Sequence, residues 1–328
     1  MPAQPQHADV VELGTSGVLV SRLGLGTAGL GGLFTPVTDD EAATVVRTAL
    51  ELGVRCLDTA PLYGRGLAES RVGRVLTRAP RASFTLSTKV GRLVRPAGTT
   101  GAEPDVPPIW PEAGARVTVL DFSADGVRRS LEESLERLGL DAVDVALVHD
   151  PDDHLDQAIG EALPALAALR DEGLVRAIGL GMNSAGPLVR VISEWSPDCV
   201  LVAGRLTLLD ASAAEELLPL CRERGIGVLV GGVLNSGILA RPQPDARYDY
   251  VPPPPPVVAR AQALAAVCAR HGVELEAAAI QFPLRYPEVD CVLVGVRSRV
   301  ELEEAVRAFD RALPAELWRE LADAGLLP

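Results

Sequence analysis

Four side chains suited to proton transfer stand at the ends of three short apolar runs in this sequence. Asp58, Lys89 and His149 each come at the end of such a run, and Tyr63 follows Asp58 closely. A free phenol has a pKa of about 10, too high for easy proton exchange near neutral pH. An ammonium beside it would lower that pKa, and a carboxylate would hold the ammonium charged and in place. The imidazole could orient a carbonyl or hydroxyl oxygen.

This set predicts carbonyl reduction or alcohol oxidation, in which Tyr63 moves a proton while a nicotinamide moves a hydride. Each residue alone has a structural alternative. Asp58 could cap a strand end, Tyr63 could be a loop aromatic, and His149 could be a buried, hydrogen-bonded histidine. Their occurrence at successive strand ends favours the catalytic interpretation, with Asp58, Lys89 and His149 supporting Tyr63.

Lys89 is the one lysine among 31 basic residues, the others being arginines. A surface cation can change from Lys to Arg at little cost. A site that needs a compact ammonium cannot, because guanidinium is planar, larger and effectively never loses its proton. The composition therefore marks Lys89 as a candidate, although a chance survivor of the arginine bias is the alternative.

The elements that must position these residues follow from hydrophobic periodicity. Short apolar runs alternate with helical patterns, which favours one α/β domain over residues 1–328, a (β/α)8 TIM barrel, over a doubly wound open sheet. The expected strands are Leu23–Thr27, Arg55–Thr59, Phe84–Lys89, Val143–Val148, Ala177–Gly181, Cys199–Val202, Gly227–Val230 and Cys291–Gly295. The expected helices are Asp39–Leu52, Ser123–Leu138, Gln157–Glu172, Ser184–Glu194, Ala213–Arg224, Val257–Arg270 and Glu274–Arg285. An N-terminal β-hairpin over Val10–Val20 and C-terminal helices over Arg299–Phe309 and Pro314–Ala324 complete the pattern.

Two longer segments interrupt this alternation. Arg92–Asp121 is rich in Pro and Gly and follows the third strand, and Arg241–Pro256 follows the seventh and ends in Pro252–Pro256. In a barrel the loops after the strands form the active face, so we expect both to border the site. The proline run is interpreted as a stiff spacer, with a polyproline ligand as the alternative. With 4% aromatic residues, we expect a polar pocket.

Composition excludes several classes of function. A net charge of −13 argues against nucleic acid or an anionic membrane as the main partner. No apolar run is long enough to span a membrane, and no export signal is visible. The five cysteines are scattered without a CxxC pair, which predicts reduced thiols, a cytoplasmic location and no metal site. A small-molecule partner is expected, and the sequence does not indicate an oligomeric state.

The motif Leu57-Asp58-Thr59-Ala60, followed by Tyr63-Gly64, Glu69 and Gly73, resembles the aldo-keto reductase family over nearly the whole chain. This resemblance implies a (β/α)8 barrel that binds NAD(P)(H) in an extended form without a Rossmann domain. It also implies that Tyr63 donates or accepts the proton, supported by Asp58, Lys89 and His149.

Three segments are similar to a narrower group, the D-threo-aldose 1-dehydrogenases or L-fucose dehydrogenases. They are Asp58–Leu67, Ala203–Leu209 and Asn235–Leu239. The resemblance implies oxidation of an aldose such as L-fucose or D-arabinose at C1 to the lactone. A pyridoxal dehydrogenase, an aldehyde or ketone reductase, a Schiff-base enzyme using Lys89, and a nicotinamide-sensing regulatory subunit are the alternatives.

The resemblance also implies where NAD or NADP lies. Asn183 matches a carboxamide-binding position, and Gly231 and Ala203 replace the usual aromatic and Gln around the nicotinamide. Glu301 stands where NADP-preferring members often carry Arg, which predicts a preference for NAD, although Arg297 and Arg299 could pair with a phosphate. The expected cofactor-binding residues are Gly26, Thr27, Asp58, Asn183, Leu234, Asn235, Ser236, Gly237, Leu239, Gly295, Arg297, Ser298 and Glu301.

Overall fold

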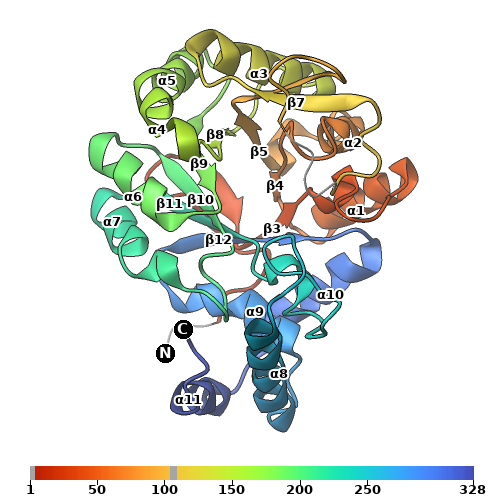
Figure 1. The fold of residues 1–328 in the computed structure, drawn as a ribbon, viewed down its shortest axis with the longest axis vertical. Coiled ribbons are helices and arrows are strands. Elements are labelled where there is room, and N and C mark those ends of the chain that lie inside the picture. Colours follow the sequence, from red (N-terminus) through yellow and green to blue (C-terminus); the bar gives the residue numbers. More distant parts are fainter. Residues whose placement is uncertain (1–3, 104–108) are drawn as a thin grey trace.

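Eight parallel strands pair in the order in which the chain makes them and close into a barrel, as the computed structural model of residues 4–103 and 109–328 shows (Figure 1). The strands are β3 (Leu23–Gly26), β4 (Cys56–Asp58), β5 (Thr85–Val90), β8 (Val145–His149), β9 (Ala177–Met182), β10 (Cys199–Ala203), β11 (Gly227–Gly231) and β12 (Val289–Gly295). β12 pairs with β3 and β9 pairs with β10, so no edge remains open. The predicted (β/α)8 barrel is therefore confirmed. Its strands are short and buried on both faces, as parallel strands between a core and a ring of helices must be.

Helices surround the barrel (Figure 1). They are α1 (Asp39–Glu51), α2 (Leu67–Leu76), α3 (Ala124–Leu138), α4 (Leu155–Gln157), α5 (Leu163–Asp171), α6 (Ala185–Glu194), α7 (Leu217–Arg224), α8 (Pro255–Arg270), α9 (Leu275–Gln281), α10 (Arg299–Asp310) and α11 (Ala315–Asp323). Side chains cap the starts of two of them: Thr38 forms a capping box with Glu41 before α1, and the Ser123 hydroxyl caps α3. The helix expected over Gln157–Glu172 is divided by a π-helical turn at Ala158–Ala162.

Helix α2 was not among the expected helices, and its composition explains why. Glu69 and Arg71 lie on its buried side, where an apolar periodicity would otherwise reveal a helix. The Glu69 carboxylate accepts from Thr88 Oγ1 at 2.7 Å and from Arg137 Nε at 2.6 Å. Arg71 donates to Asp39 and to the carbonyl of Leu30. These pairings allow charged residues to replace part of the apolar face.

A hairpin closes the N-terminal end of the barrel. Strands β1 (Val10–Glu12) and β2 (Leu19–Ser21) pair antiparallel, as the sequence predicted. Leu13, Val18 and Val20 are buried in one cluster with side chains from the barrel strands. The opposite end of the barrel, at the carboxyl ends of the strands, is bordered by the loops that connect strands to helices.

The segment expected to be a long loop after the third barrel strand contains a second antiparallel pair. Strands β6 (Arg92–Pro96) and β7 (Arg116–Leu120) lie in register over all five residues. The other long loop holds a bridge between Tyr248 and Val251 and then enters α8, whose first turn includes Pro255 and Pro256. Proline suits this position because the first helical amides need no partner within the helix.

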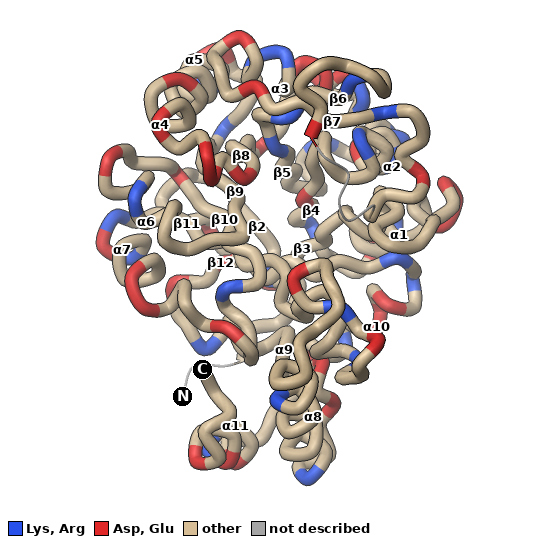
Figure 2. The backbone as a smooth tube through the Cα atoms, viewed as in Figure 1, with Lys and Arg blue, Asp and Glu red and all other residues tan. Residues whose placement is uncertain are grey.

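Charged residues lie mainly on the outer helices and connecting loops (Figure 2). All five cysteines are buried and free. Among residues 4–103 and 109–328, no helix has the length and apolar character needed to cross a bilayer. Within the same ranges no group of His, Cys, Asp and Glu side chains is arranged to hold a metal ion.

Candidate active site

The barrel register brings the ends of β4, β5 and β8 together. Asp58 is the last residue of β4 and pairs with Ser87 of β5, while Lys89 of β5 pairs with Leu147 of β8. His149 is the last residue of β8. Side chains from three neighbouring strands therefore reach the same edge of the barrel, where the turn after β4 adds Tyr63.

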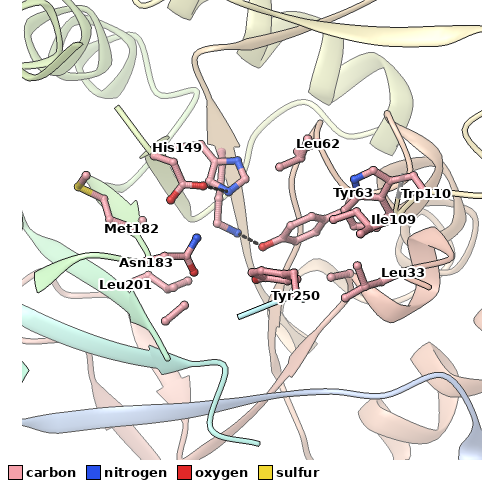
Figure 3. A pocket seen from close by; sticks show the side chains of 15 residues that line it. Leu33, Leu62, Tyr63, Ile109, Trp110, His149, Met182, Asn183, Leu201 and Tyr250 are labelled. Atoms are coloured by element: carbon pink, nitrogen blue, oxygen red, sulfur yellow. Dashed lines mark hydrogen bonds and ion pairs between the residues drawn. The ribbon is translucent and has the colours of Figure 1, made fainter. Parts of the chain in front are cut away.

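Lys89 is the centre of this arrangement. Its Nζ donates to Asp58 Oδ2 at 2.6 Å and to the Thr59 carbonyl at 3.0 Å. It also donates to Tyr63 Oη at 3.0 Å, the bond drawn as a dashed line to Tyr63 in Figure 3. All three of its donors are used, and its side chain is 1% exposed. The other carboxylate oxygen of Asp58 accepts from Ser87 Oγ at 3.0 Å. The ammonium is thus fixed between a carboxylate and a phenol.

The phenol of Tyr63 differs from the expectation. Burial raises the pKa of Tyr63 well above 10, and the negative charges of Asp58 and Asp150 raise it further, while Arg92 opposes them. The predicted lowering of the Tyr63 pKa by Lys89 is therefore wrong for the protein alone, because burial of the phenol and the negative charge of Asp58, 2.6 Å from the ammonium, raise it. In the protein alone Tyr63 is therefore a neutral phenol, and its oxygen accepts a hydrogen bond from Lys89.

His149 faces Tyr63 edge-on, with ring centroids 5.9 Å apart. Burial lowers its pKa well below 6.5, and the positive charges of Arg92 and Lys89 lower it further. The imidazole is therefore neutral at physiological pH. Its Nδ1 is buried without a partner in the described part of the chain, and its Nε2 lies 3.5 Å from Asp150 Oδ2. A neutral imidazole can donate to or accept from an oxygen bound beside Tyr63.

A cavity of about 150 Å³ opens beside these side chains (Figure 3). Its lining is largely apolar and aromatic, so the expected polar pocket is wrong. The lining residues are Ala28, Leu33, Leu62, Tyr63, Lys89, Ile109, Trp110, His149, Asp150, Gly181, Met182, Asn183, Leu201, Ala203 and Tyr250. Trp110 comes from the connection between β6 and β7 and Tyr250 from the loop before α8, so both long segments border the pocket as expected. Tyr63 and Trp110 lie with ring centroids 6.0 Å apart.

Sequence reasoning did not find two charged residues of this site. Asp150 directly follows His149 and lines the cavity. Arg92, in β6, donates to the His149 carbonyl at 2.5 Å and pairs with Glu103. Proximity in sequence to His149 was the available signal for Asp150. No comparable signal exists for Arg92, because its role depends on the hairpin of β6 and β7.

Some expected cofactor residues lie on the open face with unused polar atoms. Thr27 Oγ1 and Asn235 Oδ1 are buried without partners in the described part of the chain. Gly26 and Gly295 lie side by side, and a methyl group on Gly26 would stand 3.6 Å from the Gly295 nitrogen. Asn183 lines the cavity. The unpartnered oxygens of Thr27 and Asn235 fit a polar ligand.

The turn after β11 fits less well. The amides of Asn235, Gly237 and Leu239 donate to Gly232 and Leu234 carbonyls within the turn. The Leu239 side chain is packed in the core, away from the open face, and Leu234 packs partly against it. The Ser236 hydroxyl accepts from the Tyr250 amide at 3.1 Å. Of this group, Asn235 has a side-chain oxygen that is buried without a partner in the described part of the chain.

At the start of α10, Glu301 binds Arg297. The carboxylate accepts from the Arg297 amide at 2.8 Å and from its Nη2 at 2.9 Å. Ser298 caps the helix by accepting from the Glu301 amide. The nearby Arg299 pairs with Glu303. Both arginines that could attract a phosphate are thus already paired with carboxylates.

Comparison with known proteins agrees with this geometry. The model of the Aldo/keto reductase family matches residues 22–325. The chain is 43% identical to D-threo-aldose 1-dehydrogenase of Pseudomonas sp. over 95% of its length and 96% of that protein's. It is 37% identical to pyridoxal 4-dehydrogenase of Microbacterium luteolum over 96% of its length and 97% of that protein's.

A solved structure shares the fold as well. The holo form of an aldo-keto reductase from Bacillus halodurans superposes with a TM-score of 0.75, at 27% identity, covering 98% of this chain and 96% of that one. The family match over residues 22–325, the two relatives and the barrel lead to one conclusion. The chain belongs to the aldo/keto reductase family of NAD(P)-dependent oxidoreductases.

Proposed function

We propose that this protein oxidises an aldose of the L-fucose or D-arabinose type at C1 to the lactone. The observation that carries the proposal is the position of Lys89, whose ammonium joins Asp58 to Tyr63 at 2.6 and 3.0 Å beside the cavity. A phenol held in this way can exchange a proton with an oxygen bound in the pocket. The 43% identity to a D-threo-aldose 1-dehydrogenase supports the sugar as substrate.

In this proposal the chain's own residues handle the proton and the oxygen. For oxidation Tyr63 would first lose its proton to solvent, and the phenolate would then take the proton of the C1 hydroxyl while neutral His149 holds the same oxygen by a hydrogen bond. Asp58 and Lys89 keep the phenol in place and balance its charge. A bound nicotinamide dinucleotide supplies the acceptor for the hydride from C1.

We assign Asn183, Thr27 and Asn235 to the cofactor, together with the backbone at Gly26 and Gly295 and the start of α10. The unused oxygens of Thr27 and Asn235 support this assignment. We also propose a preference for NAD. Glu301 would repel a 2′-phosphate, and it already engages Arg297. A reducing compartment such as the cytoplasm fits the five free cysteines.

Pyridoxal is the second candidate substrate. The ring of Tyr63 lies 6.0 Å from that of Trp110, and Tyr250 adds a third aromatic side chain to the lining. Such walls could stack on a pyridine ring. The 37% identity to a pyridoxal 4-dehydrogenase favours the same substrate.

One experiment separates the candidates. Formation of reduced cofactor is followed with NAD and with NADP against L-fucose, D-arabinose, pyridoxal and simple aliphatic alcohols. We expect the highest kcat/KM for an aldose with NAD. A higher kcat/KM for pyridoxal would establish the second candidate, and failure to oxidise any aldose would overturn the proposal.

A further inference from the structure

The pocket contains a carboxylate that takes no part in the proton-transfer set of Asp58, Tyr63, Lys89 and His149. Asp150 is the one acidic side chain among the described residues that line the cavity. Its Oδ2 lies 3.5 Å from His149 Nε2, and its side chain is 19% exposed. Asp58, the other carboxylate of the site, is fully engaged by Lys89 and Ser87. Asp150 is therefore the carboxylate that remains for a ligand.

The backbone holds Asp150 in place, and Arg92 forms only a long ion pair with its side chain. Its φ of +44° is unusual for a residue other than glycine, and its amide donates to the Gly181 carbonyl at 2.9 Å. The backbone amide of Asn183 lies near its carboxylate and lowers the pKa of that group. Arg92 Nη1 stays 3.9 Å away, because Arg92 is bound to Glu103 and to the His149 carbonyl.

This placement carries an energetic cost. A carboxylate in a largely apolar cavity loses hydration, and burial raises the pKa of Asp150 to about 6. A strained backbone and a poorly compensated charge at a pocket wall are features of functional sites. At neutral pH the group is still mostly ionised and accepts hydrogen bonds.

We propose that Asp150 determines substrate specificity by accepting a hydrogen bond from the hydroxyl at C2 of the aldose. This inference rests on the proposed function. The reacting oxygen at C1 would lie between Tyr63 Oη and His149 Nε2. The C2 hydroxyl is its nearest neighbour on the sugar, and Asp150 Oδ2 is 3.5 Å from that same imidazole nitrogen. A carboxylate is acceptor-only when ionised, so it selects a hydroxyl over a hydrogen or methyl group at this position.

A different role is possible for the same residue, and the two make opposite predictions. If Asp150 acts through His149 by orienting the imidazole, its replacement impairs all substrates alike. If it binds the C2 hydroxyl, replacement impairs only substrates that carry that hydroxyl. 2-Deoxy-D-ribose provides the comparison, because it is D-arabinose without its 2-hydroxyl.

The test measures KM and kcat of the wild type and of Asp150→Asn with NAD and each of these two sugars. The side chain of Asn has nearly the same shape as that of Asp but carries no charge. Asp153→Asn, an exposed site three residues along the chain, is the matched control. Thermal unfolding of each variant shows whether it is folded.

In Asp150→Asn we expect KM for D-arabinose to rise about 10-fold, because a hydrogen bond to a charged acceptor becomes one to a neutral acceptor. KM for 2-deoxy-D-ribose should change less than about twofold, and Asp153→Asn should match the wild type. Equal impairment of both sugars, or no change with D-arabinose, overturns the inference while leaving aldose oxidation intact. A wild type that oxidises neither sugar nor L-fucose overturns the proposed function, and this inference with it.

Discussion

Lys89 and Asp58 form an ion pair at 2.6 Å with side chains that are 1% and 5% exposed. Two buried charges are costly unless their geometry is good and their other hydrogen-bonding atoms are satisfied. Here Lys89 also donates to Thr59 and Tyr63, and Asp58 accepts from Ser87. The pair is therefore held in one geometry, in which one N–H of the Lys89 ammonium is directed at the phenol oxygen of Tyr63.

Replacing this lysine by arginine should disable the site. There is little space for a guanidinium, since a methyl group on Gly181 would already lie 3.3 Å from Lys89 Cε. We expect Lys89→Arg to lower kcat by about 10²- to 10⁴-fold, because the charge no longer meets the Tyr63 oxygen. The measurement is kcat with an aldose and NAD, beside a melting curve. Arg190→Lys, on the exposed face of α6, is the control exchange. A folded Lys89→Arg enzyme with normal kcat would contradict the role given to the ammonium.

Removing the Tyr63 hydroxyl should separate chemistry from binding. Tyr63→Phe keeps the ring against Trp110 but loses the proton carrier, so kcat should fall about 10²- to 10⁴-fold. NADH affinity, measured by calorimetric titration, should stay within about twofold. Tyr248→Phe, whose ring does not line the cavity in the described structure, should behave like the wild type. Turnover retained by Tyr63→Phe would exclude Tyr63 as the acid/base.

Cofactor preference should respond to Glu301. Its carboxylate occupies Arg297 and would also repel a phosphate. In Glu301→Gln the repulsion disappears and Arg297 is freer to pair with the 2′-phosphate, so kcat/KM with NADP relative to NAD should rise about tenfold. Glu304→Gln in the same helix is the control, since Glu304 pairs weakly with Arg307 at 3.9 Å. A wild type that already prefers NADP would show the assignment to be wrong.

Stability should depend on pH through Asp150. Its pKa is about 6 in the folded protein and 3.8 in a model compound, so the folded state holds the extra proton between these values. Stability contributed by this group therefore falls as pH rises from about 4 to 6. Two pKa units correspond to about 3 kcal/mol, and Asp150→Asn removes this penalty. Urea unfolding should show the variant about 2–3 kcal/mol more stable at pH 7.5, with the difference vanishing near pH 4. A difference that does not vary with pH would refute the assignment.

The sequence predicted the elements whose signals are local. Thr38 and Ser123 begin helices where expected, and the apolar runs before Asp58, Lys89 and His149 form neighbouring strands. The barrel then brings these three residues together without further information. The likeness of the motif around Asp58 to aldo-keto reductases pointed in the same direction as these patterns.

What the sequence missed depends on contacts between distant segments. The buried charge of Glu69 is acceptable only because Arg137 and Thr88 meet it, and this pairing hid helix α2. Strands β6 and β7 are separated by a Pro- and Gly-containing connection, so the sequence of either strand did not indicate that the two pair with each other. The direction of the Tyr63 pKa shift could be determined only from the structure, because it depends on burial and on the nearby carboxylates Asp58 and Asp150.

The hairpin of β1 and β2 restricts the route by which ligands can reach the cavity. With Leu13, Val18 and Val20 filling one mouth of the barrel, molecules reach the cavity from the other mouth, beside Tyr250 and Trp110. Substrate and cofactor must then enter and leave through the same end of the barrel. If two ligands share this entrance, the one that lies deeper must bind first and leave last. The hairpin at the opposite end of the barrel therefore favours an ordered sequence of binding and release.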